Sequence, residues 1–163
     1  MVQVICCCAI AAIAAADQLI KLAVLASSLV SGGIYTVIPD ILQLRYVENT
    51  GAAFSLFSGK TELLSVFTAA VLLAGFVLIF TNKIKSKLVL TSVVMLMGGG
   101  LGNLIDRVFR HFVVDYIEVL FVDFAVFNFA DCFVTVGEFI LIGYLLYDII
   151  KDFKKGRQKA DGQ

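Results

Sequence analysis

Four long apolar runs constrain this chain more than any other feature of its sequence. They cover about residues 2–26, 63–80, 88–105 and 132–150. A helix needs about 20 largely apolar residues, with about 17–25 tolerated, to cross about 30 Å of hydrocarbon. Composition supports membrane insertion, because 60% of the 163 residues are hydrophobic and 16% are charged, against about 45–50% and about 25% in soluble domains. The sequence therefore predicts an all-α membrane protein with four transmembrane helices.

The first apolar run differs from a removable signal peptide. It lacks a basic start, and Asp17 and Lys21 interrupt its later part, whereas a removable leader carries a basic segment before a short apolar core. We interpret this run as a retained span. No Pro-rich, Ser-rich or repeated segment separates the spans, so we expect residues 1–163 to form a single membrane domain.

The placement of lysine and arginine predicts how the spans are oriented. Basic residues are dense in the short turn after the second span and in the tail: Lys83, Lys85, Lys87, Lys151, Lys154, Lys155, Arg157 and Lys159. The longer connections, 27–62 and 106–131, carry only Arg45, Lys60, Arg107 and Arg110. Because cytoplasmic loops carry the excess of basic residues, we expect both termini to be cytoplasmic and both longer connections to be extracytoplasmic.

The longer connections contain segments with strand-like patterns. In "LQLRYVENTGAAFSLF", Leu42, Leu44 and Tyr46 alternate with the residues between them, and "NTG" supplies a turn. In the second connection, "VVDYIEVL" is rich in β-branched residues. Alternation and this composition favour an extended chain. We therefore expect a small extracytoplasmic β-rich element, which either covers lipid or a bound peptide or is simply a structured loop.

Two ionisable residues lie inside the first span. Asp17 and Lys21 are four residues apart, so they share a helix face and can pair. Ionisable groups inside a span are costly and usually face protein or a water-filled cavity. Two interpretations stay open, namely an ion pair that packs helices together and an ion pair that organises a polar pocket at the outer surface.

The third span ends in "GGGLGNLIDR". This stretch resembles a phosphate-binding glycine loop, but no strand precedes it and it lies within an apolar run. Gly98 and Gly102 instead have the four-residue spacing that lets helices approach closely. We interpret the glycines as packing residues and expect Asn103, Asp106 and Arg107 to lie together at the outer boundary.

Asp115 and Asp131 are candidates for a pair of catalytic carboxyl groups. Asp131 begins the fourth span, where it could simply be the N-cap of a helix. Alternatively it pairs with Asp115, so that one carboxyl holds a proton while the other acts as a base toward water. Spacing alone does not select these two acids, because Glu118, Asp123 and Asp106 are rivals.

Other titratable residues give weaker signals. Glu138 shares the helix face of Asp131, seven residues on, but lies deeper in the span. The cysteines at 6–8 fan around a helix, and with Cys132 they give no zinc-ligand spacing, so we expect packing residues and no metal. His111 is expected to be a solvated loop residue. The net charge of zero predicts no nucleic-acid partner.

Five blocks of sequence in a fixed order resemble the lipoprotein signal peptidase (signal peptidase II) family of bacterial membrane aspartyl peptidases. The blocks are "DQLIK" at 17–21, "NTGAAFS" at 49–55, "GGLGNLIDR" at 99–107, "VVDY" at 113–116 and "FNFAD" at 127–131. The resemblance extends over nearly the whole chain, and the order of the blocks fits the predicted topology. The resemblance implies that Asp115 and Asp131 form the catalytic pair.

The resemblance also implies a pocket, a substrate and a location. The matching positions that line or support the pocket are Asp17, Lys21, Asn49, Gly51, Asn103, Asp106, Arg107, Asn128 and Ala130. The family cuts prolipoproteins that carry diacylglycerol on a cysteine, just before that cysteine, so the expected partners are this substrate, membrane lipid and globomycin-type peptide inhibitors. The family uses no metal or organic cofactor. We expect a monomer in the bacterial cytoplasmic (inner) membrane, with its active site at the extracytoplasmic face.

Three positions depart from the family pattern. Tyr116 stands where phenylalanine is common, and Cys132 stands where serine is frequent. Glu138 stands where mid-span residues are usually apolar or small. Its role stays open between tuning Asp131 and pairing with a polar group of a neighbouring span.

Two other classes of protein compete with the peptidase. A small transporter or proton channel would use Asp17, Lys21 and Glu138, but it would need a polar path across the bilayer, and the second span offers almost none. A non-catalytic lipid-binding or assembly protein would use Asp131 only as a helix cap.

Overall fold

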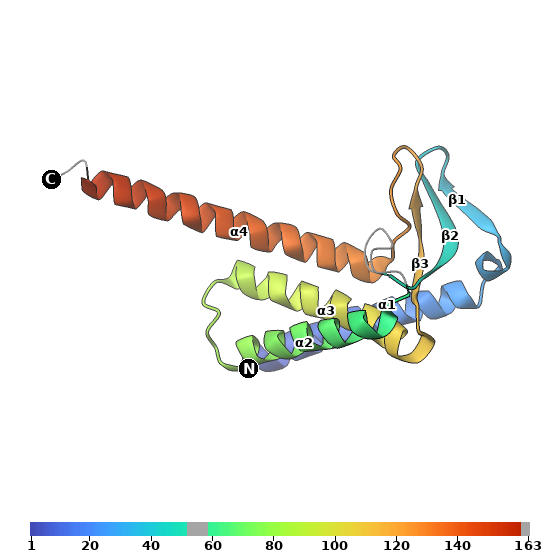
Figure 1. Cartoon of the computed structure of the whole chain (residues 1–163), viewed down its shortest axis with the longest axis horizontal. Helices are drawn as coiled ribbons and strands as arrows, with labels where there is room; N and C mark the ends of the chain where they lie inside the picture. Colours follow the sequence, from blue (N-terminus) through green and yellow to red (C-terminus); the bar gives the residue numbers. More distant parts are fainter. Residues whose placement is uncertain (52–58, 161–163) are drawn as a thin grey trace.

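The computed structural model describes residues 1–51 and 59–160, with side chains described up to Lys154. Part of the "NTGAAFS" block therefore lies outside the described residues. The described chain forms four long helices and a three-stranded sheet (Figure 1). The predicted combination of four spans with a small β-rich element is confirmed.

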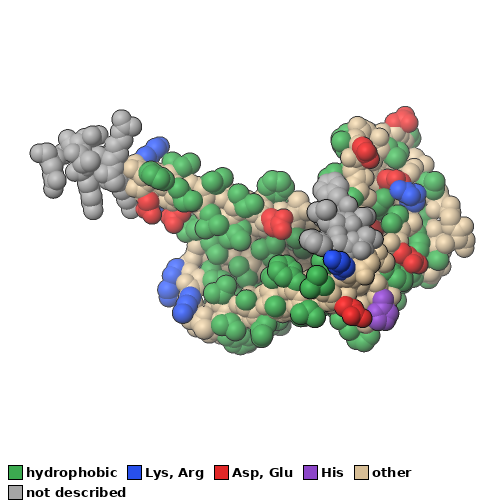
Figure 2. All heavy atoms as spheres, viewed as in Figure 1, with side chains coloured by type: hydrophobic (Ala, Val, Ile, Leu, Met, Phe, Trp, Pro, Cys, Tyr) green, Lys and Arg blue, Asp and Glu red, His purple; other side chains and the backbone are tan. Residues whose placement is uncertain are grey.

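The four helices are long and apolar enough to cross a membrane. They are α1 (Val2–Leu25), α2 (Thr61–Phe80), α3 (Lys87–Arg110) and α4 (Phe129–Ala160), and the spanning part of α4 is Phe129–Lys154. Hydrophobic side chains are widespread on the face of the helix bundle that Figure 2 shows, and at most 33% of each apolar window is buried within the protein. The exposed apolar faces suit contact with lipid, because the backbone hydrogen bonds of a helix are satisfied internally.

α3 lies at the centre of the bundle and contacts the other three helices. Its glycines allow the contact with α1. A Cβ on Gly98 would lie 2.7 Å from the Cβ of Ile13, and a Cβ on Gly102 would lie 2.6 Å from Oδ2 of Asp17. Because these positions leave no room for a side chain, the interpretation of the two glycines as packing residues is confirmed.

The sheet stands at one end of the bundle, whereas both chain termini and the α2–α3 turn lie toward the other end (Figure 1). Its antiparallel strands, in the order β1-β2-β3, are β1 (Ile34–Ile38), β2 (Leu42–Asn49) and β3 (Val113–Val119). The two segments predicted to be extended form β2 and β3, and β1 is a strand that was not predicted. Val47 pairs with Asp115 and Asn49 pairs with Val113, so the end of β2 lies beside Asp115.

The chain returns along β3 before α4 begins. Phe127 and Ile117 form an antiparallel bridge with backbone hydrogen bonds of 2.8 and 3.0 Å, and the backbone N–H of Tyr116 also donates to the Phe127 carbonyl. The bridge ends one residue before Asn128. The first turn of α4 is therefore held beside Asp115, although the two segments are separated along the chain.

The cysteines and the histidine occupy different environments. Cys6 is buried in the core between α1, α2 and α3, whereas Cys8 and Cys132 are exposed, so the packing interpretation is correct for Cys6 and wrong for the exposed pair. His111 ends α3 with a φ of 66° and is exposed. Within the part of the chain that the structure describes, no group of three His, Cys, Asp or Glu side chains could hold a metal ion.

Candidate active site

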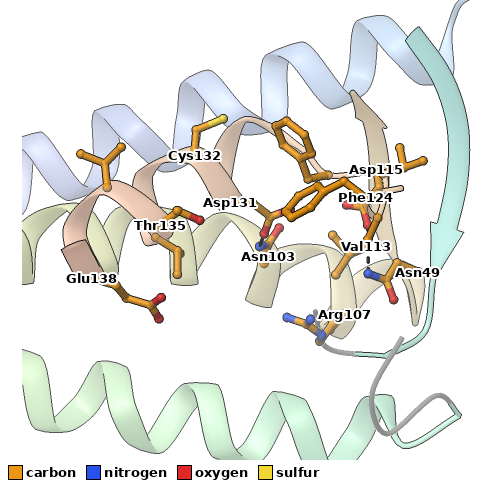
Figure 3. A pocket seen from close by; sticks show the side chains of 15 residues that line it. Asn49, Asn103, Arg107, Val113, Asp115, Phe124, Asp131, Cys132, Thr135 and Glu138 are labelled. Atoms are coloured by element: carbon orange, nitrogen blue, oxygen red, sulfur yellow. Dashed lines mark hydrogen bonds between the residues drawn. The ribbon is translucent and has the colours of Figure 1, made fainter. Parts of the chain in front are cut away.

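A cavity of about 530 Å³ is formed by residues of α3, α4, β2, β3 and the β3–α4 connection (Figure 3). Asp115 of β3 and Asp131 of α4 both line it. The other lining residues are Asn49, Asn103, Arg107, Val113, Phe124, Ala125, Val126, Phe127, Cys132, Val134, Thr135, Val136 and Glu138. The wall is mainly apolar with a few polar groups, which is typical of a site that binds a largely apolar ligand in a defined orientation.

The first turn of α4 holds Asp131. Its Oδ2 accepts a hydrogen bond of 3.0 Å from the backbone N–H of Asn128, and Oδ1 of Asn128 accepts one of 3.0 Å from the backbone N–H of Asp131. This reciprocal pair is a capping box, in which Asn128 is the N-cap and Asp131 is the third helical residue. The interpretation of Asp131 as the N-cap is therefore wrong by three residues.

Two amide side chains hold Asp115. Nδ2 of Asn49 donates to Oδ2 over 2.9 Å, and Nδ2 of Asn128 donates to Oδ1 over 2.6 Å. Asp115 is only 2% exposed, so protein groups supply nearly all of its surroundings. Asn128 contacts both Asp115 and Asp131, and it thereby fixes the two carboxyl groups relative to each other.

The pKa of the Asp115 carboxyl is raised from 3.8 to about 7, first by burial and second by the negative charge of Asp131. Hydrogen bonds from Asn49 and Asn128 and the charge of Lys21 act in the opposite direction. Burial and a neighbouring carboxylate both disfavour the charged form of an acid. Asp115 therefore keeps a proton in a large share of the molecules at neutral pH.

Asn103 of α3 connects Asp131 to a buried lysine. Its Nδ2 donates to Oδ1 of Asp131 over 2.8 Å, and its Oδ1 accepts a hydrogen bond of 2.9 Å from Nζ of Lys21. Nζ also lies 2.8 Å from Oδ2 of Asp17 and 3.0 Å from Oδ2 of Asp106. Because an ammonium group has three donors, one amide and two carboxylates satisfy Lys21 completely.

Two residues that the sequence analysis missed complete this buried network. Arg110 forms an ion pair with Asp106 and donates to Oε1 of Gln18 over 3.0 Å. Nε2 of Gln18 donates to Oδ1 of Asp106 over 3.1 Å, and Oδ2 of Asp106 accepts from the backbone N–H of Val114 over 2.9 Å. The spacing of Asp106 and Arg110 by four residues on one helix is the signal that predicts their pairing.

Asp17 connects the buried network to the start of α4. Its Oδ1 accepts a hydrogen bond of 3.1 Å from the backbone N–H of Ala130. Ala130 is completely buried, and its carbonyl lies against Gly99 of α3. The predicted ion pair between Asp17 and Lys21 is confirmed, and it lies behind the cavity wall rather than in the wall itself.

Arg107 lines the cavity near the turn that follows β2. Its guanidinium donates over 3.1 Å to the backbone carbonyl of Gly51, whose own N–H donates over 2.9 Å to Oδ1 of Asn49. Nε of Arg107 is buried and has no partner among the described residues. Arg107 thus ties the end of α3 to the turn beside Asp115.

The rival acids lie elsewhere. Glu118 binds Arg45 through contacts of 2.8 and 2.7 Å, and the hydrogen bonds from Arg45 are the main reason that its pKa is lowered. Asp123 is exposed outside the cavity lining, and Asp106 belongs to the buried network. Among the acids considered from the sequence, Asp115, Asp131 and Glu138 line the cavity.

These observations define a multi-pass membrane protein with two carboxyl groups in one cavity near the sheet end of its helix bundle. The family model described as signal peptidase (SPase) II matches residues 9–147. The chain belongs to this family, whose members are peptidases of the aspartic type. The predicted enzyme class is confirmed, and the transporter and the lipid-binding alternatives are set aside.

Individual relatives agree with the family match. A lipoprotein signal peptidase of Lactobacillus johnsonii is 34% identical over 137 residues, which cover 84% of this chain and 88% of the relative. Another, of Halothermothrix orenii, is 42% identical over 130 residues, which cover 79% and 86%. A solved structure described as a bacterial membrane enzyme determined by the in meso method at 2.3 Å superposes with a TM-score of 0.81 at 30% identity, covering 88% of each chain.

Proposed function

We propose that the protein is an intramembrane aspartyl endopeptidase that removes the signal peptide from diacylglyceryl-modified prolipoproteins, cutting before the lipidated cysteine. Membership of the signal peptidase II family and the names of the relatives support precursor cleavage. The observation that carries the proposed mechanism is that Asp115 and Asp131 line one cavity, where the pKa of Asp115 is about 7.

In the proposed mechanism the two carboxyl groups share one proton. Asp131 accepts a proton from a water molecule as the water oxygen attacks the scissile carbonyl carbon, and Asp115 donates its proton to the carbonyl oxygen. When the tetrahedral intermediate breaks down, Asp131 gives its proton to the leaving nitrogen, the C–N bond breaks, and Asp115 recovers a proton from the intermediate hydroxyl. The pair returns to its starting state, so the mechanism requires neither a metal nor an organic cofactor.

The remaining site residues have orienting and binding roles in this proposal. Asn49 and Asn128 hold Asp115, while Asn103 holds Asp131. The free Nε donor of Arg107 is suited to a carbonyl of the bound precursor. The residues that support the pocket from behind or beside it are Asp17, Lys21, Gly51, Asp106 and Ala130.

The proposal includes an orientation in the bacterial cytoplasmic membrane. Both termini and the α2–α3 turn, which carries Lys83 and Lys85, lie away from the sheet (Figure 1), and basic loops favour the cytoplasm. The cavity then faces the extracytoplasmic headgroups, where an acylated precursor arrives by diffusion in the bilayer. We expect a reporter fused after Lys85 to be cytoplasmic, and an external signal would contradict this orientation.

Other parts of the proposal concern partners and assembly. Membrane lipid surrounds the spans, and globomycin-type peptides are expected to compete with the precursor for the cavity. We propose that residues 1–163 act as one membrane domain and as a monomer. Inhibition of cleavage by globomycin tests the expected competition for the cavity, and the mass of the purified protein–detergent complex tests whether the protein is a monomer.

The proposed activity is tested with purified protein and a synthetic diacylglyceryl precursor peptide. Asp115→Asn and Asp131→Asn should each lower the cleavage rate by at least about 10²-fold, since general acid–base catalysis contributes about 10²–10⁴-fold. Asp123→Asn, an exposed acid outside the cavity lining, is the matched control and should cleave normally. A near wild-type rate in either cavity variant would show that the assignment of the pair is wrong.

A further inference from the structure

A row of polar residues descends along α4 from Asp131 into the spanning part of the helix. Thr135 and Glu138 follow Asp131 at intervals of four and three residues, the spacing of one helix face. All three side chains line the cavity (Figure 3). The mechanism uses Asp131 but leaves Thr135 and Glu138 without a role.

Neither deeper side chain has a hydrogen-bonding partner in the part of the chain that the structure describes. Thr135 and Glu138 are both exposed to the cavity or its mouth, and neither makes a hydrogen bond or ion pair with another described residue. Glu138 therefore does not pair with a polar group of a neighbouring span in the described chain, which was one role left open by the sequence. The residues beside this row, Val134 and Val136, are apolar.

An unpaired acid at this depth favours particular ligands. Without a bound segment, water can reach and solvate the exposed carboxyl group of Glu138. When a bound segment displaces that water, an apolar group opposite Glu138 leaves the carboxyl without a partner, which is costly. A group that donates a hydrogen bond avoids this cost. Thr135 and Glu138 therefore favour a bound segment that places a hydrogen-bond donor opposite them over one that places an apolar group there.

The geometry of α4 indicates which part of a precursor meets the row. At about 1.5 Å per helical residue, Thr135 and Glu138 lie about 6 Å and about 10 Å along the axis from Asp131. An extended chain rises about 3.3 Å per residue, so these distances correspond to about two and three residues from the scissile bond. The apolar core of a signal peptide precedes its cleavage site, so the segment that extends into the membrane lies on the N-terminal side.

We propose that Thr135 and Glu138 form a specificity site for a hydrogen-bond-donating side chain, a hydroxyl or an amide, located two to four residues before the scissile bond of the precursor. The Glu138 carboxyl group accepts a hydrogen bond from this side chain, the Thr135 hydroxyl donates one to the oxygen of the same side chain, and Asp115 and Asp131 perform the cleavage. This inference rests on the proposed endopeptidase function and adds a preference among its substrates.

The test compares matched precursors and matched enzyme variants. Diacylglyceryl precursor peptides carry threonine or its isostere valine at the second, third or fourth residue before the bond, and kcat/KM is measured for each. The variants are Glu138→Leu, Glu138→Gln and Thr135→Val. Phe139→Leu is the control, because Phe139 is 73% exposed on α4 and does not line the cavity.

The wild-type kcat/KM should be about tenfold or more higher for threonine than for valine at one of the positions, since a hydrogen bond to a charged group changes binding by about this factor. Glu138→Leu should remove or reverse this preference and accelerate cleavage of the valine precursor. Thr135→Val should weaken the preference. Glu138→Gln should retain part of the preference that Glu138→Leu loses. Phe139→Leu should keep the wild-type ratio.

Two results would overturn the inference while leaving the proposed function intact. One is a wild-type ratio near one at all three positions, and the other is an equal ratio in the wild type and Glu138→Leu. If the wild type cleaved none of the precursors, the proposed function itself would fail, and the inference would fail with it.

Discussion

Replacing Asp115 with asparagine is expected to remove a pH dependence of stability that the buried carboxyl group imposes. The pKa of Asp115 is about 7 in the folded protein against 3.8 for an unperturbed aspartate. Between these values the folded state holds a proton that the unfolded state has lost, so the free energy of unfolding falls as pH rises. The stabilising contribution is complete below about pH 4 and is lost by about pH 7.

The size of the effect follows from the shift. One pKa unit corresponds to about 1.4 kcal/mol, so a shift of about three units corresponds to about 4 kcal/mol between about pH 4 and about pH 7. Asparagine is neutral throughout this range and resembles the protonated form of Asp115. Asp115→Asn should therefore lack this loss of stability and be relatively more stable near pH 7, although we expect it to cleave much more slowly.

The assay is unfolding of purified protein in detergent micelles, followed by circular dichroism across this pH range. The free energy of unfolding of the wild type should decline relative to that of Asp115→Asn, and the difference should level off above about pH 7. Asp123→Asn is the control and should follow the wild type, because Asp123 is exposed. If the free energy of unfolding changed equally with pH in the wild type and in Asp115→Asn, the electrostatic reasoning would be refuted.

Three further substitutions test the scaffold of the site. Lys21→Met should destabilise the fold by about 3–5 kcal/mol, because it leaves the buried Asp17 carboxylate without its cation and removes one of the two cations paired with Asp106, and chemical unfolding measures this loss. Gly102→Ala should destabilise by about 1–3 kcal/mol in the same assay, since the added Cβ would lie 2.6 Å from Oδ2 of Asp17. Asn103→Leu should lower kcat about 10- to 100-fold by removing the hydrogen bond to Asp131, which precursor cleavage measures.

The Lys21 and Gly102 substitutions each have a matched control. Leu22→Met changes an exposed neighbour of Lys21, and Gly143→Ala adds a Cβ where no atom lies within 4 Å, so both should unfold like the wild type. A Lys21→Met or Gly102→Ala protein as stable as its control would contradict the packing argument. An Asn103→Leu enzyme with unchanged kcat would show that the amide does not orient Asp131.

The spans could be predicted from sequence because a helix in lipid satisfies its backbone hydrogen bonds within one segment. The contacts behind the site could not be predicted in this way. Arg110 and Gln18 are 92 residues apart and meet only because α1 packs against α3. A single sequence gives the spacing of residues on one helix, but it does not give the rotation of that helix against its neighbour.

The sequence at the start of α4 contains a helix-capping signal that Asp131 alone does not reveal. Asn128 and Asp131 are three residues apart and directly precede an apolar run, which is the spacing of a capping box. The N-cap of α4 is Asn128, three residues before Asp131. The strand Ile34–Ile38 was similarly marked by β-branched residues between Gly33 and Pro39, but all five of its residues are exposed, so no buried alternation strengthened the signal.

The central claim is that Asp115 and Asp131 act as one catalytic unit, and a double-mutant cycle on the rate of precursor cleavage tests it most directly. Groups that act together lose nearly all of their effect when either one is removed. We expect Asp115→Asn, Asp131→Asn and the double variant to share about the same residual rate. If the losses of the two single variants multiplied in the double variant, the two carboxyl groups would act independently and the account would be wrong.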